Sequence, residues 1–387
     1  MTWLDAAART SLTHWREQGL ERRPAVFSGA QDPVAVVGGK HTLLFSSSNY
    51  LGLSTHPAVI AAASEALTDY GVGSGGSRLT TGTTSVHREV ERSFARFLGY
   101  DDAVLFSSGF HANTAVLQTL AGPNVALFSD ERNHASIIDG CRLAKAKGAA
   151  IHVYRHQDLE SLDTLLAQDT SERRLVITDG LFSMDGTIAP VPALLEVCRR
   201  HGAALMVDDA HAIGTVGRSG RGSVEHFALM SDRPDVLIGT ASKALGAEGG
   251  VVATSSDVAR LLRQQARPFV YSTSLAPATC AAIVAAIELL ESAASPVPAL
   301  HANVDRLSSA LGMNGWVSPI LPIRVGSEAA AVERSSRLRD QGFFVPAIRW
   351  PTVPKGRAML RVTVMATHTF KQLDSLAAAL DSGCSDC

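Results

Sequence analysis

Residues 203–211 read Ala-Ala-Leu-Met-Val-Asp-Asp-Ala-His, an apolar run that ends in two carboxylates and a histidine. A second stretch of this kind, residues 236–246, reads Val-Leu-Ile-Gly-Thr-Ala-Ser-Lys-Ala-Leu-Gly. Short apolar runs bounded by polar or glycine residues are typical of buried strands. The two stretches therefore predict that Asp208, His211 and Lys243 lie just beyond the ends of two strands.

The chain around these stretches alternates between apolar runs and segments of helical periodicity, from about residue 103 to 254. Continuous apolar strands separated by helices predict a mostly parallel sheet covered by helices on both faces, an α/β fold. Ligands of such sheets bind beyond the carboxyl ends of the strands, where Asp208 and Lys243 are expected. The predicted strands are 103–107, 125–129, 151–154, 175–178, 204–207, 236–238 and 251–253, and the predicted helices are 109–120, 135–147 and 159–167.

Residues after 275 follow a different pattern. A long helical stretch to about residue 294 is followed by strands at 319–325, 343–347 and 359–364, which lie between helices at 299–311, 329–342 and 370–380. Strands and helices without regular alternation indicate a separate, smaller α+β domain. We expect a large domain over residues 51–295 and a small domain over 296–387.

Lys243 and Asp208 suggest a specific chemistry. A lysine among small residues is easily desolvated, which lowers its pKa and leaves a neutral amine able to form a Schiff base. A nearby aspartate can keep a pyridine nitrogen protonated, and these are the two protein groups that pyridoxal phosphate (PLP) requires. The alternative for an isolated Asp and Lys is a buried salt bridge between two strand ends.

Composition excludes several other classes of protein. The formal net charge of −2 gives no indication of binding to nucleic acid or an acidic membrane surface. Five scattered cysteines in a chain of 387 residues favour a reducing compartment, and we interpret Cys384 and Cys387 as part of a frayed tail. Residues 1–23 predict an amphipathic helix rather than a signal peptide, and the apolar stretch 276–290 is too short to span a bilayer. A soluble, cytoplasmic protein is expected.

Two glycine-containing segments are ambiguous. Residues 71–76 match G-x-G-x-x-G but follow a helical segment, so a turn whose backbone approaches a ligand or a second subunit is favoured over a dinucleotide fingerprint. Residues 107–113, Ser-Ser-Gly-Phe-His-Ala-Asn, lie between a strand and a helix. The amides of Gly109 and Phe110 are suited to bind phosphate at the helix N-terminus, whereas a simple N-cap by Ser107 or Ser108 is the alternative.

Two further loops follow predicted strands. His134 either stacks on an aromatic cofactor or is a loop histidine without a function. The loop 179–186, Asp-Gly-Leu-Phe-Ser-Met-Asp-Gly, is more informative because it contains bulky residues that a mere turn does not need. A metal site is not expected, since no motif with metal-ligand spacing occurs among the 13 histidines.

Taken in order, these segments resemble the α-oxoamine synthase group of fold-type I PLP enzymes. The resemblance covers about residues 3–380 and rests on residues 47–53, 71–82, 133–136, 179–186, 207–211, 239–246, 271–274, 347–354 and 360–363. It implies a PLP-dependent transferase that joins an amino acid to an acyl thioester with loss of CO2. It also implies that residues 1–50 join the small domain in space.

The resemblance implies a role for each matching residue. Lys243, His134, Asp208 and His211 are the catalytic residues: Lys243 forms the Schiff base, Asp208 pairs with the pyridine nitrogen, His211 contacts the phenolic oxygen and His134 stacks on the ring. The cofactor-binding set adds Gly109, Phe110, Ser183, Thr240 and Thr273, of which Thr273 reaches the phosphate in the partner subunit of an obligate homodimer. The substrate-binding set is Arg22 or Arg23, Asn49, His134, Arg349 and Thr352, with Arg349 holding the amino acid carboxylate.

Within the group, the chain is most similar to members that use L-alanine and a pimeloyl thioester. Members that use glycine or L-serine are the alternatives, and a binding protein without catalysis would need loss of Lys243 or Asp208. Ser242 and Asp179 depart from the commoner glycine and glutamate at these positions, which leaves the chemistry possible.

Overall fold

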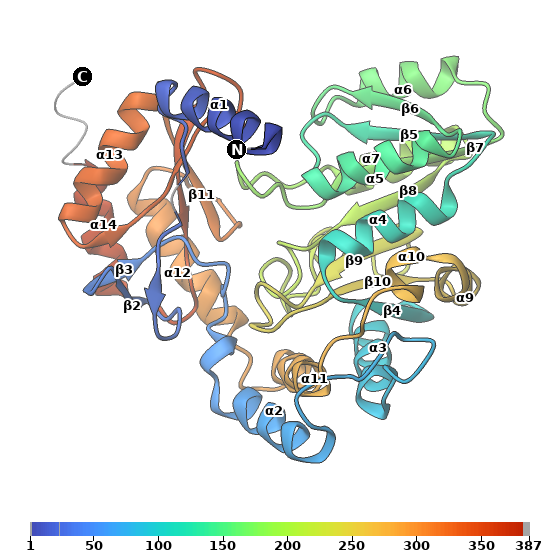
Figure 1. The fold of residues 1–387 in the computed structure, drawn as a ribbon, viewed down its shortest axis with the longest axis horizontal. Helices are drawn as coiled ribbons and strands as arrows, with labels where there is room; N and C mark the ends of the chain where they lie inside the picture. The colour runs from blue at the N-terminus through green and yellow to red at the C-terminus, as the bar shows by residue number, and fades with distance from the viewer. Residues whose placement is uncertain (1, 23, 382–387) are drawn as a thin grey trace.

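The computed structural model describes residues 2–22 and 24–381. Figure 1 shows a large sheet with its helices on one side of the molecule and two smaller sheets with α1, α12, α13 and α14 on the other. Helices α2 (Pro57–Tyr70) and α11 (Pro277–Glu291) pack against each other below the two lobes. Arg23 and the predicted tail with Cys384 and Cys387 lie outside the described residues.

The large sheet has seven strands in the order β4-β10-β9-β8-β7-β5-β6. Strand β10 is antiparallel to both of its neighbours, and the other neighbouring pairs are parallel. The predicted mostly parallel sheet is therefore confirmed. Its strands are β4 (Asp102–Phe106), β5 (Val125–Asp130), β6 (Ala150–Tyr154), β7 (Arg173–Asp179), β8 (Ala204–Asp208), β9 (Val236–Thr240) and β10 (Gly250–Thr254).

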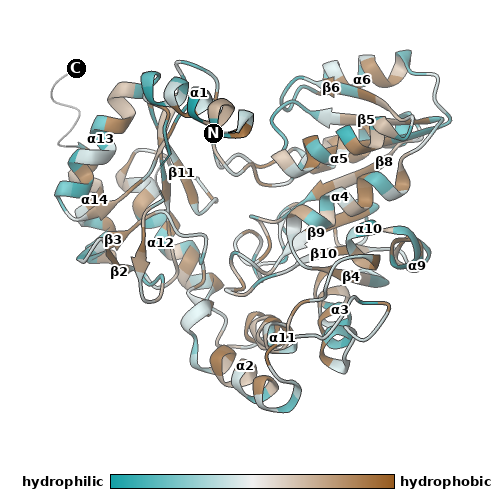
Figure 2. Cartoon of the chain, in the orientation of Figure 1, coloured by the Kyte–Doolittle hydropathy of each residue, from teal (hydrophilic) through white to brown (hydrophobic). Residues whose placement is uncertain are grey.

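Both faces of this sheet are buried. In β4, Val104 and Phe106 belong to one apolar cluster, whereas Ala103 and Leu105 belong to the other. This division follows from the alternation of side chains along a strand. One face is covered by α4 (Gly109–Leu120), α5 (Ala135–Ala146), α9 (Ser256–Gln265) and α10 (Arg267–Val270), and the other by α3 (Ser85–Leu98), α6 (Leu159–Gln168), α7 (Val191–Arg200) and α11. Figure 2 shows the apolar strands between these helices.

The second lobe contains two small sheets. One has the order β1-β2-β3-β12 and the other the order β11-β14-β13. In the first, β12 pairs in parallel with β3, so that Phe343 lies beside Leu43. The elements are β1 (Phe27–Ser28), β2 (Val34–Val37), β3 (Lys40–Leu44), β11 (Ile320–Gly326), β12 (Phe343–Phe344), β13 (Ala347–Ile348), β14 (Ala358–Thr363), α12 (Val297–Ala310), α13 (Glu328–Asp340) and α14 (Phe370–Asp381). The domain boundaries at residues 50 and 295 stay a prediction.

The prediction of one continuous strand over residues 343–347 is wrong. The stretch 343–347 forms two short strands, β12 and β13, which belong to different sheets. Pro346 stands between them. Because proline has no N–H group and interrupts a strand ladder, the chain changes sheets at this residue.

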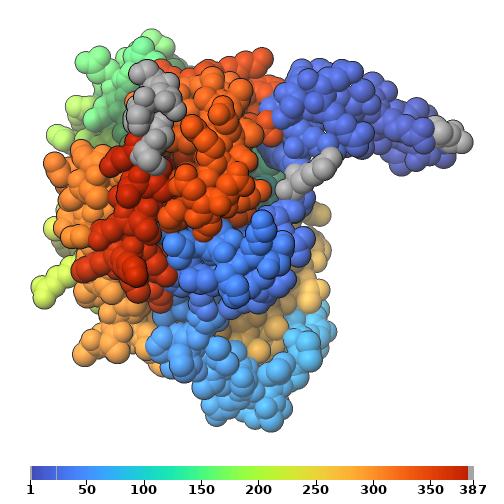
Figure 3. All heavy atoms as spheres, turned by 90° about the vertical axis from the view of Figure 1, so that its left-hand side faces the viewer, coloured from blue at the N-terminus to red at the C-terminus, as the bar shows by residue number. Residues whose placement is uncertain are grey.

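The remaining short helices are η1 (Leu53–Thr55) and α8 (Ser223–His226), and the first helix is α1 (Trp3–Glu17). Helix α1 begins with a capping box formed by Thr2 and Asp5, and none of its residues is buried. Figure 3 shows it extending from the body of the molecule. Among the described residues, no helix is both long and apolar enough to cross a membrane.

Candidate active site

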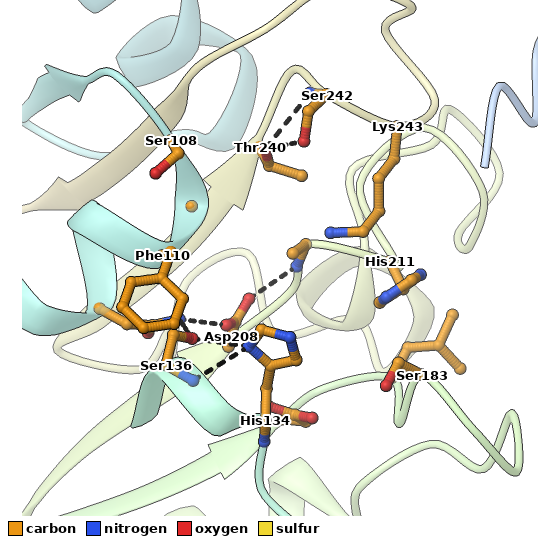
Figure 4. A pocket seen from close by; sticks show the side chains of 15 residues that line it. Ser108, Phe110, His134, Ser136, Ser183, Asp208, His211, Thr240, Ser242 and Lys243 are labelled. Atoms are coloured by element: carbon orange, nitrogen blue, oxygen red, sulfur yellow. Dashed lines mark hydrogen bonds between the residues drawn. The ribbon is translucent and has the colours of Figure 1, made fainter. Parts of the chain in front are cut away.

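A cavity of about 150 Å³ lies at the carboxyl ends of β7, β8 and β9 (Figure 4). Eight of the residues predicted from the sequence line it, and the structure thus brings together segments from 109 to 243. The lining residues are Ser108, Gly109, Phe110, Asn113, His134, Ser136, Asp179, Leu181, Ser183, Asp208, Ala210, His211, Thr240, Ser242 and Lys243.

Asp208 ends β8 and is almost fully buried. Its Oδ2 accepts a hydrogen bond from Nδ2 of Asn113 at 2.6 Å, and its Oδ1 accepts one from the backbone N–H of Ala210 at 2.9 Å. The same Asn113 amide donates to the hydroxyl of Ser136 at 2.9 Å. The carboxylate is therefore held in one orientation at the floor of the cavity.

Lys243 follows β9, and its amine points into the cavity (Figure 4). Burial lowers the pKa of this amine, while the charges of Asp208 and Asp179 oppose that shift. Asp208 and Asp179 act on this amine through their charges and not through a hydrogen bond, so the salt-bridge alternative finds no support. A desolvated amine of this kind is suited to nucleophilic and base chemistry.

The two predicted catalytic histidines are held as neutral rings. Burial lowers the pKa of His134, against the effect of Asp208, and its Nδ1 lies 2.7 Å from the hydroxyl of Ser136. Burial, reinforced by the charges of Lys243 and Arg361, holds the pKa of His211 well below its usual value. Nδ1 of His211 is hydrogen-bonded to the hydroxyl of Tyr50 at 2.8 Å. Both rings are therefore fixed in place by a hydroxyl group.

The N-terminus of α4 forms one wall of the cavity. Ser108 is the N-cap, and its hydroxyl accepts the N–H of His111 at 3.1 Å. The amides of Gly109 and Phe110 belong to the first turn of the helix, where N–H groups have no intrahelical partner. The hydroxyls of Thr240, at the end of β9, and Ser242, just after it, lie 2.8 Å apart beside this helix end. Such a set of donors is suited to bind a phosphate.

The predicted substrate-binding residues other than His134 do not line this cavity. Asn49 donates to the hydroxyl of Ser54 at 2.7 Å, and Arg349 donates to the carbonyl of Gly19. Thr352 is exposed and donates its N–H to the carbonyl of Arg349 at 3.0 Å. Arg22 is also exposed, and its alternative Arg23 lies outside the described residues. Their substrate roles stay predictions.

Thr273 lies in a second, smaller cavity of about 10 Å³ that also includes Ser107. It pairs with Ser77, and the N–H of Ser274 donates to the carbonyl of Gly76 at 3.0 Å. The glycine-rich loop 71–76 follows helix α2, as predicted, and packs its backbone against the segment that contains Thr273. This placement argues against a dinucleotide fingerprint.

Several residues at the site were not predicted from the sequence: Tyr50, Asn113, Ser136 and Arg361. Asn113 lies one helical turn after Gly109 and Phe110, a spacing that places it on the same face of α4. Arg361, on β14, donates from Nε to the carbonyl of Ser183 at 2.6 Å and from Nη2 to the hydroxyl of Tyr50 at 3.4 Å. No local pattern predicts this contact, because Arg361 reaches the site from the other lobe.

Comparison with known proteins shows a match to the family described as aminotransferase class I and II, over residues 40–380. The chain is 48% identical to the biotin biosynthesis bifunctional protein BioWF of Corynebacterium kroppenstedtii, over 98% of this chain and 58% of that protein. It therefore spans little more than half the length of this relative.

Two other relatives match over nearly their whole length. The 8-amino-7-oxononanoate synthase of Lysinibacillus sphaericus is 43% identical, over 95% of each chain. Among solved structures, the serine palmitoyltransferase of Sphingomonas wittichii superimposes with a TM-score of 0.90 at 33% identity, over 96% of each chain.

Proposed function

Because this chain belongs to the class I and II aminotransferase family, we propose that it condenses L-alanine with a pimeloyl thioester. The products are 8-amino-7-oxononanoate, CO2 and the free thiol, a step of biotin biosynthesis. The observation that carries the proposal is the meeting of the buried Asp208 and the half-buried Lys243 in a single cavity at the strand ends. The choice among α-oxoamine synthases is supported by the 43% identity to the 8-amino-7-oxononanoate synthase of Lysinibacillus sphaericus, which extends over 95% of each chain.

The residues of the cavity fit PLP. Lys243 would hold the cofactor covalently through its amine, and Asp208 would bind the ring nitrogen. The ring of His134 would stack on the pyridine, and His211 would contact the phenolic oxygen. The phosphate would bind at the N-terminus of α4, where Gly109 and Phe110 offer amides, while Ser183 and Thr240 would offer hydroxyls. When bound, PLP stabilises negative charge that develops at the Cα atom of an amino acid.

The amine of Lys243 is the base that this site offers for the α-proton of L-alanine. Its lowered pKa leaves a larger fraction neutral, and a neutral Nζ accepts a proton. Asp208 is held in position for the ring nitrogen by the hydrogen bonds that Asn113 and Ala210 donate to it. The neutral rings of His134 and His211 add no competing positive charge.

Two arginines are candidates for the carboxylate of L-alanine. The family resemblance implies Arg349, whereas geometry favours Arg361, whose guanidinium contacts the carbonyl of the cavity-lining Ser183. A guanidinium binds a carboxylate through two parallel hydrogen bonds. Arg349, which contacts the segment leading to Arg22, is then placed with Arg22, Asn49 and Thr352 to meet the acyl substrate.

We also propose a homodimer with shared active sites, in which Thr273 reaches the phosphate held by the partner subunit. Exposed apolar side chains around the glycine-rich loop support an interface here: Val72 is 82% exposed and Tyr271 is 71% exposed. Side chains of this kind gathered on one surface indicate an interface. We place the protein in the cytoplasm, since the described cysteines Cys141, Cys198 and Cys280 are all free.

The test is a thiol-release assay that crosses L-alanine, glycine and L-serine with pimeloyl, acetyl, succinyl and palmitoyl thioesters. We expect the highest kcat/KM for L-alanine with a pimeloyl donor, on CoA or on a carrier protein. A preference for glycine with acetyl-CoA would instead assign the chain to the glycine C-acetyltransferases. Release of thiol by the wild type but not by Lys243→Ala separates an enzyme from a binding protein of the same fold.

A further inference from the structure

Loop 181–188 lies where the cavity, the end of β5 and the second lobe meet. Leu181 and Ser183 line the cavity. The loop is closed on itself, since Leu181 pairs with Ile188 and the N–H of Phe182 donates to the carbonyl of Thr187 at 2.9 Å. The N–H of Gly186 also donates to the carbonyl of Phe182 at 2.9 Å, so the two ends of the loop are joined to each other.

On the side of the large sheet, Asp185 attaches the loop to the segment that contains His134. Oδ2 of Asp185 accepts a hydrogen bond from Nη1 of Arg132 at 3.0 Å. Oδ1 of Asp185 accepts one from the hydroxyl of Thr187 at 2.8 Å. The ring of His156 packs edge-on against Phe182, with ring centroids 4.5 Å apart. Asp185 is the only charged residue in the sequence of loop 181–188. Its partner, Arg132, lies two positions before His134 in the chain.

On the side of the second lobe, the same loop supports Arg361. The carbonyl of Ser183 accepts the Nε–H of Arg361 at 2.6 Å. A Cβ atom added to Gly186 would lie 2.2 Å from the carbonyl oxygen of Ile320 in β11, so the loop sits directly on this lobe. A displacement of the loop therefore also moves the carbonyl that orients the Arg361 guanidinium.

We propose that Asp185 is a positioning residue for amino acid binding. Its ion pair with Arg132 fixes loop 181–188, and through the Ser183 carbonyl this loop orients Arg361 toward the carboxylate of the substrate. The inference rests on the proposed function, because it assumes that an amino acid binds in this cavity. Side chains of Arg132 and Asp185 are 53% and 17% exposed, so the pair adds little to the stability of the fold. Breaking this ion pair is therefore expected to weaken the binding of the amino acid and to leave the stability of the fold nearly unchanged.

The experiment uses the full chain loaded with PLP and follows the absorbance change on titration with an amino acid, which gives Kd without the acyl donor. We expect Asp185→Asn and Arg132→Gln to weaken L-alanine binding about fivefold to twentyfold, as for a broken positioning contact. The affinity for PLP and the temperature of unfolding are expected to stay at wild-type values. The exchange Arg132→Asp with Asp185→Arg is expected to recover part of the lost affinity. A matched control is Asp374→Asn, which breaks the exposed pair of Asp374 with Arg306 and leaves Kd unchanged.

Unchanged Kd in Asp185→Asn and Arg132→Gln overturns the inference, as does an equal loss in Asp374→Asn. If Asp185→Asn does not fold, Arg132→Gln decides the question alone, since Arg132 is a largely exposed side chain. Titrations with glycine and L-serine keep the two proposals separate. A wild-type chain that binds glycine but not L-alanine refutes the proposed substrate, whereas a parallel loss for glycine in both variants still supports Asp185.

Discussion

Nδ2 of Asn113 donates a hydrogen bond to Oδ2 of Asp208 across 2.6 Å, and both side chains are buried at the floor of the cavity. The bond joins the first turns of α4 to the end of β8. It fixes the orientation of the carboxylate, because an N–H donor and a carboxylate oxygen form a strong, directional hydrogen bond. Asn113 thus helps to hold Asp208 where the proposed cofactor needs it, beside its ring nitrogen.

Asn113→Ala should weaken PLP binding by about tenfold, since a hydrogen bond to a charged group contributes roughly 1.5–3 kcal/mol. Fluorescence titration of the cofactor-free protein with PLP measures this directly. The control is Asn314→Ala, an exposed asparagine far from the site in sequence, which should bind PLP like the wild type. Equal PLP affinity in Asn113→Ala and the wild type would rule out this role.

Asp209, adjacent to Asp208, predicts a pH dependence of stability. Burial raises its pKa to about 7, although two hydrogen bonds from Ser223 oppose the shift. An acid with a raised pKa in the folded state stabilises the fold fully below about pH 4, and that contribution falls as pH rises toward 7. Asp209→Asn removes the titration, so its stability relative to the wild type should rise between pH 4 and 7, by at most about 1.4 kcal/mol per pH unit. Urea unfolding of both proteins at pH 5 and pH 8 gives the difference between their free energies of unfolding. If this difference is the same at both pH values, Asp209 does not titrate in this range.

Arg361 and Arg349 can be distinguished by conservative substitution. Lysine keeps the charge but loses the paired hydrogen bonds of the guanidinium. Arg361→Lys should raise KM for L-alanine roughly tenfold while KM for the pimeloyl thioester changes less, because Arg361 contacts the cavity wall. Arg349→Lys should show the reverse pattern. Steady-state kinetics with each substrate varied in turn decides between them, and an L-alanine effect confined to Arg349→Lys would restore the assignment from family resemblance.

The proposed sharing of active sites between two subunits predicts complementation between two inactive variants. Lys243→Ala lacks the reacting amine, and Thr273→Glu places a negative charge against the phosphate of the partner site. A mixed dimer of the two contains one site with both lesions and one intact site. Unfolding and refolding the variants together should therefore recover up to about a quarter of wild-type activity. No recovery, with mixed dimers demonstrated by a tag on one variant, would place Thr273 outside the partner site.

Much of the large lobe is predictable from local sequence. Buried strands such as β8 and β9 are continuous apolar runs, and the polar residues that follow them must meet at one edge of a parallel sheet. This reasoning places Asp208, His211 and Lys243 correctly, and the family match confirms the resemblance that named the cofactor. Helices α3 and α7 were not predicted, although their amphipathic patterns, with one buried face each, are of the kind that indicates a helix.

What local sequence does not contain is contact between distant segments. Arg361 lies in the buried strand β14, so the sequence around it indicates a position in the core. Nothing in that local sequence indicates that its side chain contacts Ser183 in the other lobe. The split of 343–347 into β12 and β13 depends on two different partner strands, of which the local pattern shows neither. The hydrogen bond between Tyr50 and His211 joins residues that are 161 positions apart in the sequence.

The parallel pairing of Phe343 with Leu43 has a consequence for biosynthesis. Strands β1 to β3 leave the ribosome early, but the neighbour that covers their edge is made about 300 residues later, which takes roughly 15–60 s at ordinary translation rates. During that interval the nascent chain presents an uncovered strand edge, a feature that favours aggregation. Newly made chains should therefore depend on chaperones until residues 343–344 emerge, even though the large sheet can form before them.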